Sequence, residues 1–159
     1  MSHDVETRIE DGKLYVSRIY DAPREAVFDA WIATHKLEQW WGCAQTTAVS
    51  AEIECKVGGK FNQTMTLDNG HVMPGEATFS EYDPPARLVF GSPGPTGEPM
   101  TVSVDFTEVD GGTLVQLVHS GIPDMKVDGD IEMHDIIRGG WTAAFGKLAG
   151  FLETSSAAS

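Results

Sequence analysis

The sequence predicts an α+β fold in which a curved antiparallel sheet of about seven strands wraps around a long C-terminal helix. Residues 134–153 carry apolar side chains at the i, i+3, i+4 and i+7 spacing of a helix that buries one broad stripe. The segments between residues 46 and 120 instead alternate apolar and polar residues, with turn-rich breaks between them. Packing the helix against the sheet would bury the apolar stripe of the helix and the apolar face of the sheet together.

The length of 159 residues is enough for one domain with its own core, and we expect this domain to span residues 13–153. Residues 1–12 are polar and are expected to form a flexible N-terminus. Residues 154–159, of sequence TSSAAS, are expected to form a flexible tail. No internal repeat or second domain is evident in the sequence.

The net charge of −13 argues against two classes of partner, because an acidic surface repels nucleic-acid phosphates and anionic lipids. The sequence has no apolar run of about 18 residues, so we expect no membrane insertion. Its first residues lack the charged-then-apolar pattern of a secretory signal. Cys43 and Cys55 are the two cysteines, which favours a cytoplasmic protein with reduced thiols over a disulfide scaffold.

The N-terminal part of the domain predicts one strand followed by two short helices. Residues 14–20 are rich in β-branched and aromatic side chains, as in a strand. A helix is expected over residues 23–32, because proline suits the first helical position and an acidic residue follows in the first turn. Thr34 is a suitable cap for a second helix that would contain Trp40 and Trp41.

From residue 46 onward the pattern has a period of two and predicts a meander of antiparallel strands. Asn69-Gly70 and Gly111-Gly112 are typical of tight hairpin turns. The short spacings between strands leave no room for crossover helices, so neighbours along the chain should pair. The expected strands span residues 46–55, 60–67, 72–82, 87–91, 99–108 and 113–120.

The acidic segment 121–135 precedes the long helix and has two interpretations. A solvated loop is the simpler one, since negative charge is favourable before a helix N-terminus. A calcium site is the alternative, but the glycine and distal glutamate of an EF-hand loop are not in place. The sequence also lacks paired metal-ligand motifs, a phosphate-binding loop and a nucleophile elbow, so we predict no metal and no cofactor.

Three features favour a cavity between the sheet and the long helix. Trp40 and Trp41 are adjacent, so at least one ring should face the cavity. Glycines reduce the volume of the long helix, and the polar residues Gln63 and His119 fall on apolar strand faces, where they would orient a ligand. The predicted ligand-binding residues are Trp40, Trp41, Phe61, Met65, Val104, Phe106, Leu117, His119, Trp141 and Phe145.

Residues 18–42 (RIYDAPREAVFDAWIATHKLEQWWG), 57–61 (VGGKF) and 84–90 (PPARLVF), together with Gly140-Trp141, provide a resemblance to a known family. They resemble the activator-of-heat-shock-protein-90-ATPase-like family, within the START-like (SRPBCC) helix-grip superfamily. The resemblance covers about residues 13–153 in the right order. It implies a β–α–α–six-strand–α chain around a hydrophobic cavity.

The sequence departs from that family at two points. The eukaryotic co-chaperone carries an additional N-terminal domain for chaperone binding, which this sequence does not contain, so ATPase activation is not expected. Residues 137–139 are less polar than the usual approach to Gly140-Trp141, so the long helix is expected to kink there or to begin as late as Gly140.

Three functional hypotheses follow. The leading one is a non-enzymatic module that binds an apolar or amphipathic small molecule in the cavity. The second is a cyclase- or dehydratase-like enzyme, as some relatives in the superfamily are, in which His119 and a carboxylate would meet in the same cavity; a hydrogen-bonded core histidine is the simpler interpretation of His119. The third is a chaperone-associated interaction module with an exposed apolar patch.

The long helix also predicts a self-contact. Gly139, Ala143, Gly146 and Gly150 form a stripe of small residues opposite the apolar one, with little charge nearby. A solvent-facing helix surface normally carries more charge. We therefore hypothesise that this face contacts a second subunit, so that a homodimer is a possible assembly.

Overall fold

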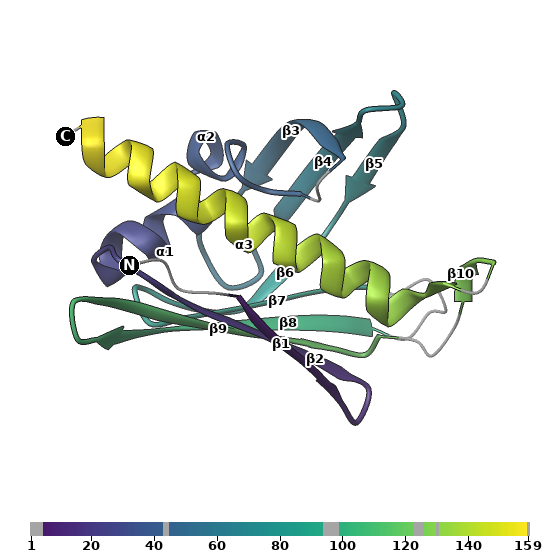
Figure 1. Cartoon of the computed structure of the whole chain (residues 1–159), viewed down its shortest axis with the longest axis horizontal. Helices are drawn as coiled ribbons and strands as arrows, with labels where there is room; N and C mark the ends of the chain where they lie inside the picture. The colour runs from purple at the N-terminus through teal and green to yellow at the C-terminus, as the bar shows by residue number, and fades with distance from the viewer. Residues whose placement is uncertain (1–4, 43–44, 94–98, 123–125, 130, 159) are drawn as a thin grey trace.

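The computed structural model describes residues 5–42, 45–93, 99–122, 126–129 and 131–158. The long C-terminal helix, α3 (Met133–Ala158), lies across one face of a six-stranded sheet, and a three-stranded sheet faces the helix from its other side (Figure 1). This arrangement covers the apolar faces of the sheets and of the helix together. The predicted α+β class, with a curved antiparallel sheet against a C-terminal helix, is confirmed.

The larger sheet is built from β1 (Glu6–Glu10), β2 (Lys13–Tyr20), β6 (Thr78–Asp83), β7 (Arg87–Pro93), β8 (Pro99–Val109) and β9 (Gly112–Ser120). Its order is β1-β2-β9-β8-β7-β6, and all neighbours are antiparallel. Its inner face carries apolar side chains at every second position, as Val102, Val104 and Phe106 do in β8. This period-two pattern is the one that predicted the strands.

The smaller sheet is built from β3 (Thr46–Ile53), β4 (Phe61–Leu67) and β5 (Val72–Gly75), in that order. It meets the larger sheet near the start of β4, where an isolated bridge links Lys60 to Thr78. The Phe61 N–H also donates to the Ala77 carbonyl at 2.9 Å. The two sheets are thus two arms of one strongly bent surface, as expected when strand twist accumulates.

The prediction of one continuous strand over residues 72–82 is wrong. The chain pairs with β4 as far as Gly75, changes partner, and pairs with β7 from Thr78 onward. Pro74 and Gly75 stand at this change of partner and are typical of a strand break, a signal that the prediction of one continuous strand did not use. The single sheet of about seven strands is for this reason two sheets.

The N-terminal residues are more ordered than expected, because Glu6–Glu10 form β1. Asp11 and Gly12 have positive φ angles of 53° and 74°, which suits a tight hairpin between β1 and β2. Val5 and Ile9 are partly buried against the core. The expectation of a flexible N-terminus is therefore wrong for residues 6–10.

Two short helices follow β2. The first, α1 (Arg24–Ile32), confirms the predicted helix, with Pro23 at its N-cap. The second, α2 (Thr34–Leu37), is only one turn long and has Ala33, not Thr34, at its N-cap.

Trp40 and Trp41 follow α2 instead of lying within it. Their backbone N–H groups still donate to the Leu37 carbonyl, at 3.2 and 3.0 Å, and hold the chain in turns. The two rings come to lie 5.6 Å apart between centroids. Trp40 and Trp41 therefore lie close together, although neither belongs to a helix.

Helix α3 is longer at both ends than the sequence predicts. It begins at Met133, after a small ribbon of β10 (Lys126–Asp128) and β11 (Ile131–Glu132), so a start as late as Gly140 is wrong. It ends at Ala158, so the backbone of residues 154–158 is helical, and not a loose tail. Burial of Trp141 and Phe145 compensates for the low helix propensity of the preceding glycines. Within the described part of the chain, no helix is long and apolar enough to cross a membrane.

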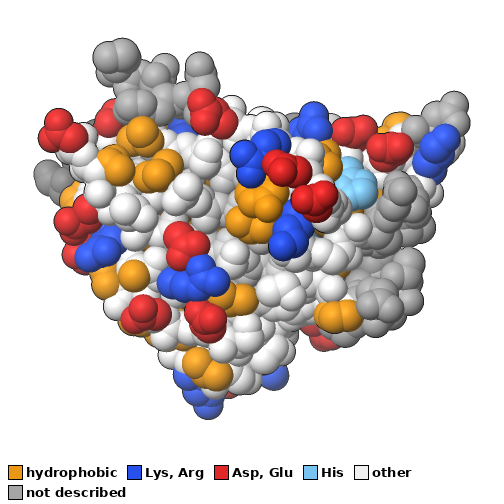
Figure 2. Space-filling view, turned by 90° about the horizontal axis from the view of Figure 1, so that it is seen from below, with side chains coloured by type: hydrophobic (Ala, Val, Ile, Leu, Met, Phe, Trp, Pro, Cys, Tyr) orange, Lys and Arg blue, Asp and Glu red, His pale blue; other side chains and the backbone are white. Residues whose placement is uncertain are grey.

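The outer face of the larger sheet carries charges of both signs. Seen from below in Figure 2, Lys and Arg side chains lie beside Asp and Glu side chains. Arg87 Nε donates to Glu81 at 2.8 Å, and Arg87 Nη1 donates to Asp105 at 2.7 Å. Mixed charges at hydrogen-bonding distance are typical of a solvent-facing sheet surface.

Candidate ligand-binding cavity

The inner face of β4 is packed at one end and open at the other. Phe61, Gln63, Met65 and Leu67 share this face because successive side chains alternate. Phe61 is fully buried, and Gln63 is buried with its Nε2 donating to the Phe61 carbonyl at 3.0 Å. Met65 and Leu67 are only half-buried. The hollow part of the sheet therefore begins beyond Gln63.

The N-terminal half of α3 presents the opposing wall. Ile137, Gly140, Trp141 and Ala144 recur at i+3 and i+4 spacing, so they share one face of the helix. Gly140 adds no side chain to this face, and a Cβ built there would meet nothing within 4 Å. The missing volume leaves a gap between α3 and the smaller sheet.

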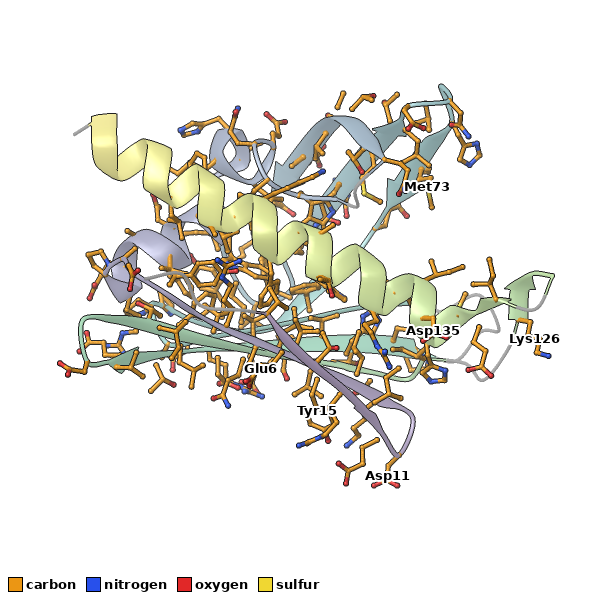
Figure 3. The ribbon with its side chains drawn as sticks, viewed as in Figure 1. Glu6, Asp11, Tyr15, Met73, Lys126 and Asp135 are labelled. Atoms are coloured by element: carbon orange, nitrogen blue, oxygen red, sulfur yellow. The ribbon has the colours of Figure 1, made fainter. Side chains whose placement is uncertain are left out.

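This gap is a cavity of about 700 Å³ that opens to solvent at its rim. Met65 of β4 and Met73 of β5 are direct cross-strand partners and form part of its wall. Figure 3 shows Met73 on β5, above the N-terminal half of α3. The lining residues are Trp41, Gly42, Gln45, Met65, Leu67, Asp68, Asn69, Met73, Ile136, Ile137, Gly140, Trp141 and Ala144.

Two tryptophans form the inner end of the cavity. The rings of Trp41 and Trp141 meet edge to face, with centroids 5.3 Å apart and an interplanar angle of 85°. Trp31 stacks behind Trp141 at 6.1 Å and is itself fully buried. Rings fixed in this way give the cavity a rigid aromatic end wall.

His119 orients one of these rings. The Trp141 Nε1–H donates to His119 Nδ1 at 3.0 Å, which requires the neutral ring with its proton on Nε2. Burial lowers the pKa of His119 to about 4, so the neutral form is the one present at pH 7.

The surroundings of His119 do not form an acid–base pair. Its Nε2 is buried without a hydrogen-bond partner among the described residues, and no described carboxylate bonds to the ring. His119 is also not one of the residues that line the cavity. The ring is therefore placed to position Trp141, and no described side chain stands beside it as the second member of an acid–base pair.

The rim of the cavity is polar. Gln45, Asp68 and Asn69 lie there, close to the turn between β4 and β5. The Asp68 N–H donates to the Gln45 carbonyl at 2.9 Å, and Asn69 Oδ1 accepts from the His71 N–H at 2.9 Å. An apolar interior with a few polar groups at its edge is the usual composition of a small-molecule site.

The ten predicted ligand-binding residues divide into three groups. Trp41, Met65 and Trp141 line the cavity, so the structure brings these three together from α3, β4 and the segment after α2. His119 lies behind Trp141. The remaining six are buried in the packed core: Trp40, Phe61, Val104, Phe106, Leu117 and Phe145.

Sequence reasoning missed several lining residues. Leu67 shares the alternating face of Met65, so the period-two pattern contained its signal. Ile136 and Gly140 lie beside the helical stripe and not on it, and the sequence does not show where along the helix the cavity lies. Met73 lies on the strand after the predicted Asn69-Gly70 turn, but its pairing with Met65 depends on the register of that hairpin, which the alternating pattern does not fix.

The described residues include no group of three or more His, Cys, Asp or Glu side chains placed to hold a metal ion. Cys55 is an exposed free thiol. Cys43 and positions 123–125 and 130 of the acidic segment lie outside the described residues.

Solved structures of several bacterial proteins are similar to this chain. A Nitrosomonas europaea protein aligns with a TM-score of 0.77 at 19% identity, over 94% of this chain and 99% of that one. A Chromobacterium violaceum protein gives 0.78 at 19% identity, over 91% and 99%. The AHSA1-like protein of Aeromonas hydrophila gives 0.72 at 22% identity, over 91% and 94%. At these identities the similarity establishes the fold.

No curated protein matches the sequence. The sequence model for the Activator of Hsp90 ATPase homolog 1-like protein family matches residues 21–153, from the turn before α1 into the last turns of α3. This range includes both walls of the cavity and the two tryptophans at its end. The chain therefore belongs to the Activator of Hsp90 ATPase homolog 1-like protein family.

Proposed function

We propose that the protein binds an apolar or amphipathic small molecule in the cavity between the smaller sheet and the N-terminal half of α3. The observation that carries this proposal is the volume of about 700 Å³ lined by Trp41, Met65, Met73 and Trp141. Sites for small molecules usually have several hundred Å³ and a mainly apolar lining. Exposure of this apolar lining to water is unfavourable, and a bound ligand would cover it.

The polar rim supports an amphipathic ligand in particular. An apolar chain fits between the methionines and α3, while Gln45, Asp68 and Asn69 offer polar contacts to a head group. Such a ligand keeps its polar end hydrated and buries only its tail. We assign no reaction to the site, because His119 has no carboxylate partner among the described residues.

Three further predictions concern a chaperone contact, the cellular location and the oligomeric state. A chaperone contact rests on the family name and on exposed apolar residues such as Val72 and Ile136, which are 53% and 47% exposed. A cytoplasmic location and a homodimer stay predictions. The cavity favours the small-molecule hypothesis over the chaperone hypothesis, which expects little internal volume.

A cavity-filling variant tests the proposal with a matched control. Gly140→Leu should place a side chain in the cavity, since Gly140 lines it and a Cβ there meets nothing. Gly146→Leu makes the same change on the exposed face of the same helix. Both replace a helical glycine by a better helix former, so neither is expected to unfold the protein.

Calorimetric titration with decan-1-ol measures the outcome. We expect the wild type and Gly146→Leu to bind with similar affinity, and Gly140→Leu to bind at least about tenfold more weakly, a loss of about 1.4 kcal/mol. No saturable binding to the wild type, or equal binding by both variants, would contradict the proposal.

A further inference from the structure

The charged group at the mouth of the cavity indicates which head group the ligand carries. Resting on the proposed function, we propose that the cavity selects cationic amphiphiles, in which an alkyl chain ends in an ammonium group held beside Asp68. Asp68 follows Leu67, whose side chain lines the cavity, and stands at the start of the turn between β4 and β5. The carboxylate is therefore next to the apolar wall that would hold the chain.

The lining carries charge of one sign. Among its described residues Asp68 is the one with a charged side chain, and no Lys or Arg lies with it. Gln45 and Asn69 supply neutral polar groups on the same rim. An anionic head group would meet a like charge with no cation to offset it, whereas an ammonium would meet an opposite one.

The Asp68 side chain is available for such a contact. Its backbone N–H is used by the Gln45 carbonyl, but its carboxylate has no ion-pair or hydrogen-bond partner within the described part of the chain. On α3, Arg138 is not part of the lining and pairs with Asp135 at 3.9 Å. An incoming cation would thus not have to displace an existing partner.

The opposing wall allows the chain to extend away from Asp68. Ile137 and Gly140 of α3 face Met65 of β4 across the cavity, and Trp141 closes the inner end. An alkyl chain between them buries its methylene groups against apolar side chains while the ammonium stays at the hydrated rim. The net charge of −13 acts in the same direction at longer range.

Three ligands with the same alkyl chain length and different head groups distinguish the contribution of the head group to affinity from that of the chain. Decyltrimethylammonium, decan-1-ol and decanoate are titrated into the protein at about 0.15 M salt, where the general surface field is screened beyond about 8 Å. The variants are Asp68→Asn and, as a control, Asp110→Asn. Asp110 is an exposed turn residue next to Gly111 and is not part of the cavity lining, and its substitution removes the same charge.

We expect the wild type and Asp110→Asn to bind decyltrimethylammonium about fivefold more tightly than decanoate, the scale of an exposed ion pair. In Asp68→Asn the two affinities should agree within about twofold, with decan-1-ol bound as in the wild type. Equal affinity for cation and anion in the wild type, or a preference that persists in Asp68→Asn, would overturn this inference and leave the proposed function intact. Failure of all three ligands to bind would overturn both.

Discussion

The two halves of α3 present the same helical stripe to very different surroundings. From Phe145 to Leu152, which we call the packed half of the stripe, Phe145 and Leu148 are fully buried, and the Phe145 ring lies 6.3 Å from that of Trp31. In the N-terminal half, Ile136 is 47% exposed and Gly140 has open space beside it. The difference comes from the opposing elements, because Trp31 of α1 fills the space beside Phe145, whereas β4 and β5 leave the space beside the N-terminal half of α3 open.

This contrast shows how one amphipathic helix can serve both as core and as cavity wall. The side chains that line the cavity lack packing contacts, which lowers stability. The closely packed half of α3 offsets this loss. Mutations in the two halves should therefore act on different quantities, stability in one and binding in the other.

The largest expected effect comes from breaking the packed half. Phe145→Ala should lower the free energy of unfolding by about 3–5 kcal/mol, because it leaves a void in a closely packed aromatic cluster. Ile136→Ala, at the cavity mouth, should cost less than about 0.5 kcal/mol. Urea unfolding of the two variants measures the difference, and equal losses would remove the distinction between the halves.

The next largest effect is the pH dependence of the free energy of unfolding that His119 produces. Burial holds the pKa of His119 at about 4, below its ordinary 6.5. As pH falls from 6.5 toward 4 the unfolded chain gains a proton that the folded chain does not, so this stabilising contribution is complete above pH 6.5 and is lost on acidification. The loss should reach about 2–3 kcal/mol at pH 4.5.

His119→Gln isolates this contribution, because an amide oxygen can still accept from Trp141 Nε1 but does not titrate in this range. Urea unfolding at pH 7 and pH 4.5 should show the smaller loss in the variant. An identical pH dependence in the two proteins would mean that His119 is not held neutral by burial.

A smaller effect is expected where the larger sheet is tied to the packed half. The Tyr20 hydroxyl donates to the Phe145 carbonyl at 2.9 Å, and burial raises the pKa of Tyr20, so the hydroxyl remains protonated. Tyr20→Phe removes this hydrogen bond at a cost of about 1 kcal/mol. Thermal unfolding should show the loss, while affinity for decan-1-ol stays the same; a change in affinity would show that the two halves are coupled.

The smallest change in stability is expected on the outer, exposed face of α3. Gly146→Ala should raise the free energy of unfolding by about 0.5–1 kcal/mol, since a Cβ there meets nothing and the helix gains propensity. Gly112→Ala is the opposite case, because its Cβ would lie within 2.2 Å of the Tyr20 carbonyl oxygen. Stabilisation by both changes would contradict this description of the glycines.

Much of the fold could be predicted from local patterns. The helical period located the stripe of α3, and period-two alternation located most strands, because both follow from which side chains must be buried. What those patterns cannot contain is the choice of partner. The transfer of the chain from β4 to β7 after Gly75 depends on tertiary packing. The pairing of β1 with β2 had a local signal, the Asp11-Gly12 turn, which the prediction of a flexible N-terminus did not use.

The candidate site was harder to predict for the same reason. Trp40 and Trp41 are indistinguishable by sequence, yet Trp40 is fully buried with its Nε1 donating to the Ala30 carbonyl at 2.9 Å, while Trp41 lines the cavity. Phe145 and Trp141 likewise share one helix face and differ only in what stands opposite. The position of the cavity depends on which elements lie opposite each residue, and a local sequence pattern does not contain that information.

The four tryptophans provide the most direct test, because two line the cavity and two belong to the packed core. Their indole N–H signals can be followed by NMR during titration with decan-1-ol and assigned by single Trp→Phe variants. We predict saturable shifts that are largest for Trp41 and Trp141 and smaller for Trp31 and Trp40. Unchanged indole signals at saturating decan-1-ol, or the largest shift at Trp40, would contradict a ligand held between the smaller sheet and α3.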